Sequence, residues 1–307
     1  MLHGAFGGRV TLLVEAAIGR VRRAHQESAA DAGAHGLGGP ASPYDHAAAP
    51  WQLGGRTYLP LAGDAMLLSR FEQGFAVLLD VGCAVRTNAP GVEVDGASYE
   101  RRLAEGFTRF RALAADAGHY YCIAASPSRL PAVLAIARGD GAVRILAGGE
   151  SPLNETHLSL PQSFDCAVGE GERCHGFFYP PLEGGETPPL LVFLHGGPTS
   201  ACYPMLDPRI QYWTQRGFAV ADLNYRGSSG YGREYRQALH LSWGEVDVED
   251  ACAVVSYLAE QGLIDGERAF IRGGSAGGYT TLCALAFQQV FRAGASLYGV
   301  SDPVALA

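Results

Sequence analysis

The sequence predicts a doubly wound, mostly parallel α/β sheet that is preceded by an all-β region. Three observations support this fold class. The residues after about 161 alternate between strand-like and helix-like patterns, whereas those before about 150 contain short apolar runs separated by turn formers. In addition, the strand-to-helix turn at residues 271–279 carries the pattern G-x-S-x-G. Alternating strands and helices are typical of parallel sheets, and short strands at regular spacing are typical of all-β domains.

The composition is that of a globular protein that does not bind nucleic acid. The 307 residues are 48% hydrophobic and 18% charged, and the formal net charge is -8. An acidic chain without a basic run argues against nucleic acid as a partner. The seven cysteines form no C-x-x-C pair, so the sequence predicts neither a zinc site nor a disulfide framework. We therefore expect a reducing compartment.

The N-terminal residues do not resemble a signal peptide. The apolar stretch at residues 10–18 is short and is interrupted by Glu15, and no stretch is long enough to span a membrane. These features predict a cytoplasmic protein with no membrane partner. Residues 29–50 are rich in small residues and are expected to form a long loop or an insertion.

The region from Trp51 to about residue 150 is predicted to be all-β. Turn formers such as Glu72-Gln73-Gly74 separate the apolar runs, and a hairpin is expected where Ile136 pairs with Val143 across Gly139-Asp140-Gly141. A sandwich, a barrel and a propeller all remain open, and a propeller would have only two or three blades here. The predicted strands are 57–59, 65–68, 75–79, 120–124, 132–136 and 143–146.

Residues 148–161 are the predicted linker, and the α/β pattern begins after them. The run Leu190-Leu191-Val192-Phe193-Leu194 is continuously apolar, as a central parallel strand should be. Further strands are expected at 174–179, 218–223, 269–271 and 293–298, and helices at 208–216, 245–261 and 279–287. The active groups should then lie at the carboxyl ends of the parallel strands.

The turn at residues 273–277 indicates a catalytic site. Gly273, Ser275 and Gly277 match the nucleophile elbow, with a strand before them and a helix after them. The glycines are needed because side chains there would collide with the neighbouring strand and helix. The turn raises the hydroxyl above the sheet and directs a helix N-terminus at it, which favours a developing oxyanion. Ser275 is therefore the predicted nucleophile, and a merely tight structural turn is the alternative.

A second glycine-rich stretch, His195-Gly196-Gly197-Pro198, directly follows the strand at 190–194. In a serine acyl-transfer site such a loop supplies one oxyanion donor, and the N–H after the nucleophile, here that of Ala276, supplies the other. In this fold the catalytic His follows the serine along the chain, so His195 is predicted to form a structural hydrogen bond instead of acting as the base. The alternative is a loop that only turns the chain.

Two further stretches carry polar residues at predicted strand and helix ends. Residues 224–232 form a glycine-rich loop in which Arg226 is predicted to make fastening hydrogen bonds. A direct substrate role for Arg226 or Tyr231 is the alternative. Asp247 and Asp250 open a long helix, where acidic residues suit the helix dipole, so a capping role is favoured over a catalytic carboxylate.

These motifs resemble, in order and spacing, the prolyl oligopeptidase family of serine peptidases. The most similar branch is that of the dipeptidyl aminopeptidases and acylaminoacyl-peptidases. The resemblance is strong from about residue 164 to 307 and looser from 51 to 150, where the family carries the last blades of a β-propeller. The motifs that carry it are residues 195–198, 224–232, 243–250 and 273–279.

The resemblance implies a partial β-propeller region over residues 1–160, with 1–50 poorly defined, and the N-terminal part of an α/β-hydrolase catalytic domain over 161–307. It implies Ser275 as the nucleophile, with Gly197 (alternatively Gly196) and Ala276 as oxyanion donors. It also implies a peptide or acyl-peptide substrate and no metal or organic cofactor. A homo-oligomer is compatible with it.

The sequence departs from the family pattern after the elbow. The family's catalytic Asp and His follow two further strands, but no histidine follows Ser275 here and the one aspartate, Asp302, comes too early for the acid. We therefore expect a chain truncated at both ends, and an inactive fragment that lacks the triad Asp and His.

Three functions follow from these features. The leading hypothesis is a serine peptidase that releases N-terminal residues, dipeptides or acyl-amino acids through an acyl-enzyme at Ser275. A carboxylesterase-like hydrolase shares the elbow and the Gly-Gly loop, but the all-β region favours the peptidase. A pseudoenzyme that keeps the fold without catalysis is the third.

Overall fold

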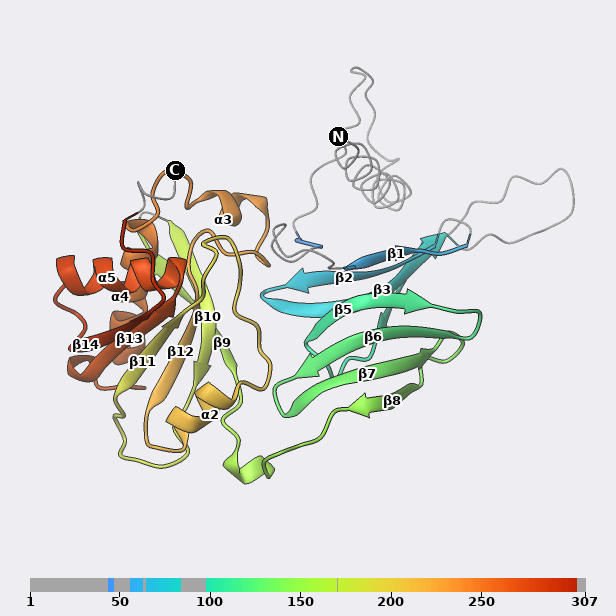
Figure 1. Cartoon of the computed structure of the whole chain (residues 1–307), viewed down its shortest axis with the longest axis horizontal. Helices are drawn as coiled ribbons and strands as arrows, with labels where there is room; N and C mark the ends of the chain where they lie inside the picture. Colours follow the sequence, from blue (N-terminus) through green and yellow to red (C-terminus); the bar gives the residue numbers. More distant parts are fainter. Residues whose placement is uncertain (1–43, 47–55, 63–64, 84–97, 170, 303–307) are drawn as a thin grey trace, which may run out of the picture.

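The computed structural model describes residues 44–46, 56–62, 65–83, 98–169 and 171–302, which form two parts (Figure 1). A β part contains strands β1 to β8, and an α/β part contains strands β9 to β14 with helices α2 to α5. The connection between the parts includes the short helix η1 (Glu155–His157) and passes along the bottom of the view in Figure 1. Apart from residues 44–46, the expectations for residues 1–50 lie outside the described residues.

The β part consists of two four-stranded antiparallel sheets, each with its strands in chain order. Such a four-stranded unit is the blade of a β-propeller, so the expected partial propeller is confirmed as two blade-like sheets. The first sheet contains β1 (Tyr58–Pro60), β2 (Met66–Glu72), β3 (Phe75–Cys83) and β4 (Ser98–Leu103). The second contains β5 (Arg109–Ala115), β6 (His119–Ser126), β7 (Arg129–Ala137) and β8 (Val143–Gly148).

Two tight turns lie where the sequence places turn formers, and the second confirms the predicted hairpin. Gln73 and Gly74 have φ angles of 51° and 82° and join β2 to β3, as a two-residue hairpin turn with two positive φ angles should. Ile136 pairs with Val143 in the hairpin of β7 and β8, and Asp140 closes that turn by accepting a hydrogen bond of 2.9 Å from the N–H of Ala142.

Strands β4 and β5 were not predicted. The outward positions of β4 are charged: Glu100 forms an ion pair with Arg70 on β2, and Arg102 forms one with Glu72. Cross-strand ion pairs therefore supply contacts that a search for apolar runs does not detect. In β5 the register shifts between Arg111 and Ala114, which interrupts the alternation of its side chains.

The two sheets of the β part share one hydrophobic core. Leu67, Leu78 and Leu103 from the first sheet pack in a single cluster with residues of the second, which include Phe110 and Leu134. A carboxylate lies at the edge of this core, since Asp80 accepts hydrogen bonds from Tyr99 (3.0 Å), Tyr120 (2.9 Å) and Arg101 (3.0 Å). These three donors offset the cost of burying the charge.

The α/β part is built on one six-stranded sheet with the order β14-β13-β11-β12-β10-β9. The four strands from β14 to β12 are parallel, and β10 and β9 add antiparallel to them. This confirms the expected mostly parallel sheet. The strands are β9 (Gln162–Val168), β10 (Glu172–Tyr179), β11 (Leu190–Leu194), β12 (Ala219–Asn224), β13 (Ala269–Gly274) and β14 (Ala293–Leu297).

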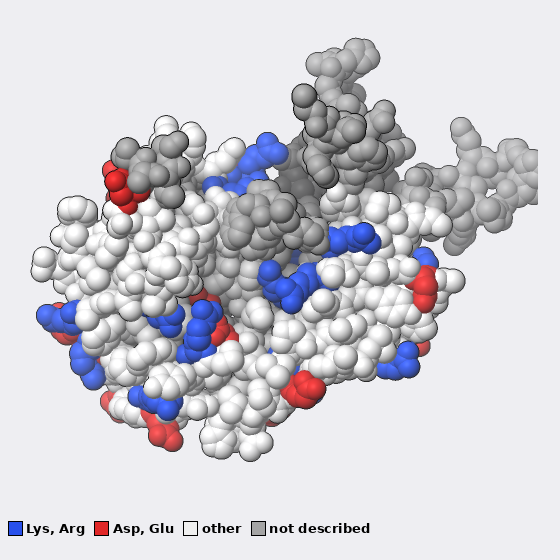
Figure 2. Space-filling model, in the orientation of Figure 1, with Lys and Arg blue, Asp and Glu red and all other residues white. Residues whose placement is uncertain are grey.

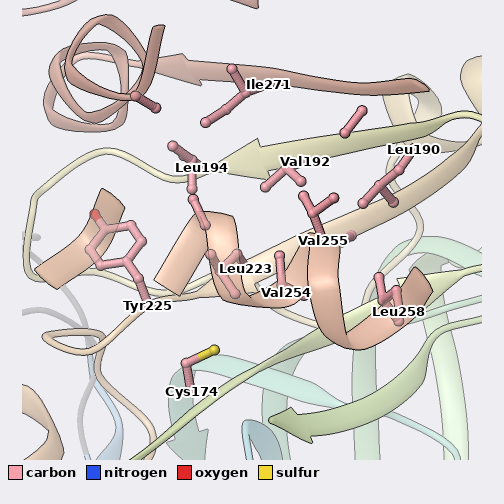
Figure 3. Close-up of a cluster of buried hydrophobic side chains, with 14 of the residues drawn as sticks. Cys174, Leu190, Val192, Leu194, Leu223, Tyr225, Val254, Val255, Leu258 and Ile271 are labelled. Atoms are coloured by element: carbon pink, nitrogen blue, oxygen red, sulfur yellow. The ribbon is translucent and has the colours of Figure 1, made fainter. Parts of the chain in front are cut away.

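Helices cover both faces of this sheet, as expected for a doubly wound fold. Helix α4 (Val246–Glu260) and helix α5 (Ala276–Phe287) pack on one face, where Val254, Val255 and Leu258 meet Leu190, Val192 and Ile271 (Figure 3). Helix α2 (Pro208–Thr214) packs on the opposite face against Phe193 and Val220 through Ile210. The short helix α3 (Arg233–Gln237) follows the loop after β12.

The β part and the α/β part contact each other at several places, which include the ring pair of Phe75 and Phe177 and two sets of hydrogen bonds. Asp45 lies beside β2, where its carbonyl accepts a hydrogen bond of 2.8 Å from Phe71, and its carboxylate accepts bonds from the amides of Gly230 (2.7 Å) and Gly232 (3.2 Å). On the second sheet, Ser126 accepts a bond of 2.8 Å from the N–H of Leu206. The predicted boundary at residue 160 stays a prediction; β8 ends at residue 148 and β9 begins at residue 162.

All 23 side chains of the Lys and Arg type are arginine, since the sequence contains no lysine. Figure 2 shows these side chains scattered over the visible face, with Asp or Glu beside several of them. No helix of the described residues is long and apolar enough to cross a membrane.

Candidate active site

Ser275 occupies a sharp turn between β13 and α5, as the sequence predicts. Its φ of 54° and ψ of -117° lie outside the ordinary regions for a residue with a side chain, which costs about 1–3 kcal/mol. Two hydrogen bonds from outside α5 hold this backbone: the N–H of Ser275 donates to the carbonyl of Leu297 (3.1 Å), and its own carbonyl accepts from Val300 (3.2 Å). The strain is therefore maintained by β14 and the residues that follow it.

The elbow glycines are required by close backbone contacts. A Cβ on Gly273 would lie 2.2 Å from the carbonyl oxygen of Gly277. A Cβ on Gly277 would lie 2.5 Å from the oxygen of His195 and 2.7 Å from that of Leu194. The predicted collisions with the helix and with the neighbouring strand are therefore confirmed.

The loop at residues 195–198 lies directly against the serine. A Cβ on Gly196 would be 3.3 Å from Ser275 Cβ and 3.9 Å from its Oγ, so only glycine leaves this approach open. Gly197 is exposed with a φ of 140°, and a Cβ there would meet the backbone of Thr199 at 2.7 Å. The structure thus places Gly196 close beside Ser275, with Gly197 next along the loop.

Within the described part of the chain, Ser275 and the predicted oxyanion donors are free to bind a ligand. The side chain of Ser275 is exposed and caps no helix N–H. Among the described residues, no acceptor is found for the N–H groups of Gly196, Gly197 and Ala276. Ala276 is the first residue of α5, where the N–H has no partner inside the helix. A developing oxyanion could accept hydrogen bonds from such groups.

His195 forms structural hydrogen bonds near the loop, as the sequence predicts. Its Nε2 lies 2.7 Å from Ser228 Oγ and its Nδ1 lies 2.8 Å from the carbonyl oxygen of Gly196, while its ring stacks on Tyr225 at 4.3 Å. Burial lowers the pKa of His195 to about 4, so the ring is neutral near pH 7.

Tyr225 holds both ends of the loop at residues 195–198. Its hydroxyl lies 3.1 Å from the carbonyl oxygen of His195 and 3.0 Å from that of Pro198, and its side chain is fully buried. One hydroxyl therefore fixes the two carbonyls that flank the glycine pair. The sequence analysis did not single out this residue, although it lies in the motif at residues 224–232.

Arg226 fastens the loop after β12, as expected. Its Nε donates to Asp250 Oδ1 (2.8 Å), its backbone N–H donates to Asp250 Oδ2 (2.6 Å), and its guanidinium also pairs with Glu172 and Glu249. Arg226 and Asp250 are 4% and 0% exposed, so they form a buried ion pair. Burial raises the pKa of Asp250 to about 6, and the bonds from Arg226 oppose that rise.

Asp247 and Asp250 of α4 have structural partners of different kinds. Asp247 lies in the first turn, where its Oδ1 accepts a bond of 2.6 Å from the N–H of Gly244 and its Oδ2 accepts one from Thr280 Oγ1. Asp250 lies beyond the first turn and binds Arg226. The expected role at the start of the helix therefore holds for Asp247. For Asp250 the expectation is wrong, because this residue forms an ion pair with Arg226 instead.

The Trp243-Gly244 motif packs against the elbow helix. The rings of Trp243 and Tyr279 lie 4.8 Å apart. Gly244 has a φ of 92°, and a Cβ on it would be 2.7 Å from Tyr279 Cε1. Together with Asp247, these contacts attach the start of α4 to the first turns of α5.

Three site-supporting contacts could not be found from the sequence. Ser228 binds His195, Thr280 binds Asp247, and Asp45 binds the amides of the loop after β12. Ser228 and Thr280 lie within or near recognised motifs, so their proximity to the site was detectable, but their partners were not. Asp45 lies in a tract with no pattern, and its partners are about 185 residues away.

The strained serine at the end of a parallel strand, the glycine loop beside it and the two blade-like sheets define an α/β-hydrolase preceded by part of a β-propeller. Comparison with known proteins finds a family match: residues 204–307 match the profile of the Prolyl oligopeptidase family. The match covers about a third of the chain.

Three relatives show the extent of the similarity. The chain is 28% identical over 244 residues to the uncharacterized peptidase YuxL of Bacillus subtilis (strain 168), covering 75% of this chain and 37% of that protein. It is 37% identical over 99 residues to an acylamino-acid-releasing enzyme of Arabidopsis thaliana, covering 32% of this chain and 13% of that protein. A solved structure of a Mycobacterium tuberculosis puromycin-hydrolyzing peptidase superposes with a TM-score of 0.76 at 34% identity, covering 89% of this chain and 41% of that one. The chain therefore spans less than half the length of these relatives.

Proposed function

We propose that this protein is a serine peptidase that releases N-terminal residues, dipeptides or acyl-amino acids from peptides. The observation that carries the proposal is the exposed Ser275 in a strained turn, with the glycine loop at Gly196 close beside it. The family match supports a peptidase, and the Arabidopsis and mycobacterial relatives support aminoacyl or acyl-aminoacyl substrates.

In the proposed reaction, Ser275 Oγ attacks the carbonyl carbon of the bond to be cleaved. The carbonyl oxygen becomes an oxyanion, and the N–H groups of Ala276 and Gly197, or alternatively Gly196, donate hydrogen bonds to it. Each such donor contributes on the order of 10²–10³ in rate. Collapse of the tetrahedral intermediate releases the amine and leaves the acyl group on Ser275, and water then releases that group.

His195 is not assigned as the base in this proposal. Its Nε2 is bound to Ser228, and its pKa of about 4 makes it a weak base near pH 7. The expectation that the 307-residue chain has little or no hydrolase activity stays a prediction. This prediction is tested by comparing the 307-residue chain with the polypeptide that is expressed when the reading frame is extended through the DNA downstream of codon 307.

The test compares cleavage of aminoacyl and acyl-aminoacyl 4-nitroanilides by both polypeptides, each with and without Ser275→Ala. If the extended frame adds an acid and a histidine, we expect the extended polypeptide to cleave the anilides and Ser275→Ala to abolish this cleavage. The 307-residue chain should not cleave them. Turnover that survives Ser275→Ala contradicts the assignment of the nucleophile. Cleavage of 4-nitrophenyl esters without cleavage of anilides supports the carboxylesterase instead. A Ser275 that resists a fluorophosphonate in the extended chain supports the pseudoenzyme.

A further inference from the structure

Two cysteines that have no role in the proposed reaction face each other across a pair of neighbouring strands. Cys166 on β9 and Cys174 on β10 are direct register partners in an antiparallel ladder. Their Sγ atoms lie 3.0 Å apart, and the two residues are 1% and 0% exposed. Cys174 lies in the same buried cluster as Leu223 and Val254 (Figure 3).

The backbone geometry of this pair suits a covalent bond. Directly opposite residues of an antiparallel ladder have Cα atoms about 4.5–5.5 Å apart, and disulfides span Cα separations of about 4.4–6.8 Å. A disulfide needs an S–S distance of about 2.05 Å, so the sulfurs have to approach by only about 1 Å. Strand β9 is the edge of the six-stranded sheet, so it can shift without breaking a second ladder.

The other described cysteines offer no comparable pair. Within the described part of the chain, Cys166 and Cys174 alone have their sulfur atoms within hydrogen-bonding distance of each other. Cys202, for comparison, donates its thiol to the carbonyl oxygen of Asp222 at 3.2 Å. The hydrogen bond from Cys174 lowers the pKa of Cys166, which favours Cys166 as the thiolate.

We propose that Cys166 and Cys174 form a modification site, at which a peroxide converts the two thiols into an inter-strand disulfide. The Cys166 thiolate attacks one peroxide oxygen, the O–O bond breaks, and a sulfenic acid and hydroxide form. The Cys174 sulfur then attacks the Cys166 sulfur, the S–O bond breaks, and water leaves. Overall the two thiols lose two electrons and two protons, and hydrogen peroxide is reduced to two molecules of water.

The disulfide would join β9, the first strand after the connection from the β part, covalently to β10. The free thiols seen in the structure are the reduced state of this site. The site thus differs from a structural disulfide framework, because the fold already forms while both thiols are free.

The sequence allows a direct test by peptide mapping. Arg173 lies between the two cysteines, so trypsin places Cys166 in the peptide 145–173 and Cys174 in the peptide 174–209. The Cys202→Ser variant leaves one cysteine in each peptide. This variant, folded and full-length, is treated with hydrogen peroxide, unfolded, alkylated with N-ethylmaleimide and digested. We expect the two peptides to be joined, with a mass two hydrogen atoms below their sum.

Two further variants in the same background serve as controls. Cys166→Ser should abolish the joined peptide, whereas Cys252→Ser, which removes a cysteine of α4 outside the pair, should leave it unchanged. The proposal is overturned if both peptides carry N-ethylmaleimide after peroxide treatment of the folded chain. It is equally overturned if Cys166 is oxidised to a sulfinic acid without a cross-link, or if the joined peptide forms only from the urea-unfolded chain.

Discussion

The carboxylate of Asp247 on α4 accepts a hydrogen bond from the hydroxyl of Thr280 on α5, and both residues are completely buried. This bond connects the start of the long helix to the helix that begins at the elbow. Burial raises the pKa of Asp247, while Thr280 and the N–H of Gly244 oppose that rise. The position of the first turns of α5 therefore depends on a buried polar contact as well as on apolar packing.

Thr280→Val is expected to destabilise the protein by about 1–3 kcal/mol, because it leaves one oxygen of a buried carboxylate without a donor. The measurement is the free energy of unfolding in urea. Thr281→Val is the matched control, since the Thr281 hydroxyl is buried in the same helix but binds only the carbonyl of Gly277 at 2.8 Å. Equal losses of unfolding free energy in the two variants would show that the hydrogen bond from Thr280 to Asp247 contributes no more than the bond from Thr281 to Gly277.

Arg226→Gln is expected to cost about 3–5 kcal/mol, because it leaves Asp250 charged and buried without its partner. Adding Asp250→Asn should restore part of the loss, as a double-mutant cycle would show. Arg173→Gln is the control: its ion pair with Asp165 is about half exposed, and its loss should cost less than about 1 kcal/mol. A loss for Arg226→Gln no larger than that of the control would contradict the importance of the buried pair.

Tyr225→Phe is expected to destabilise the protein by about 1–2 kcal/mol, because two carbonyls of the loop at residues 195–198 lose a donor. Tyr257→Phe is the control, because no hydrogen bond of the Tyr257 hydroxyl is found among the described residues. If the frame extended past codon 307 yields an active enzyme, the variant in that polypeptide should also lower kcat more than it raises KM, since it disturbs the predicted oxyanion donors. A change in stability equal to that of Tyr257→Phe would argue against a role for this hydroxyl.

Gly277→Ala is expected to destabilise the fold by at least about 1–3 kcal/mol. Its Cβ would meet two backbone oxygens of β11 and the following residue, neither of which can rotate away. Gly139→Ala, in the hairpin between β7 and β8, has open space around the new Cβ and should change stability by less than about 0.5 kcal/mol. The measurement is the midpoint of thermal unfolding of both variants. Similar midpoints would contradict the close contact of the backbone at Gly277 with the oxygens of Leu194 and His195.

Asp222→Asn should change how stability depends on pH. Burial raises the pKa of Asp222 from its ordinary 3.8 to about 7, so between these values the folded chain binds more protons than the unfolded chain. The free energy of unfolding contributed by this group therefore falls as the pH rises from about 4 to 7. The variant lacks this contribution, so its stability relative to the parent should increase by about 3–4 kcal/mol from pH 4 to pH 8. Profiles of stability against pH that run parallel for the variant and the parent would contradict the shift.

The parts that the sequence predicted best are those in which local pattern and tertiary environment agree. Leu190–Leu194 is a strand at the expected residues, because all five side chains are buried in a parallel sheet. Helix α5 begins earlier than expected, at Ala276 instead of Tyr279, because tertiary packing overrides the low helix propensity of Gly277 and Gly278. The edge strand β9 was missed because three of its seven residues are polar and only Cys166 and Val168 are buried.

Within the site, motif spacing predicted which residues lie near Ser275 but not which atoms they bind. The pairing of His195 with Ser228 depends on how two loops from different strands meet, and no local pattern encodes that meeting. The same holds for Thr280, whose partner lies 33 positions away on another helix.

The contact of Asp45 with Gly230 has a consequence for the order in which this protein folds. It closes a segment of 185 residues, and the entropic cost of closing a chain grows with its length. Such a bond cannot nucleate structure, so it forms only after the blades and the sheet on either side have assembled. Protection of the Gly230 amide from hydrogen exchange should consequently appear later during refolding than protection of the β11 amides.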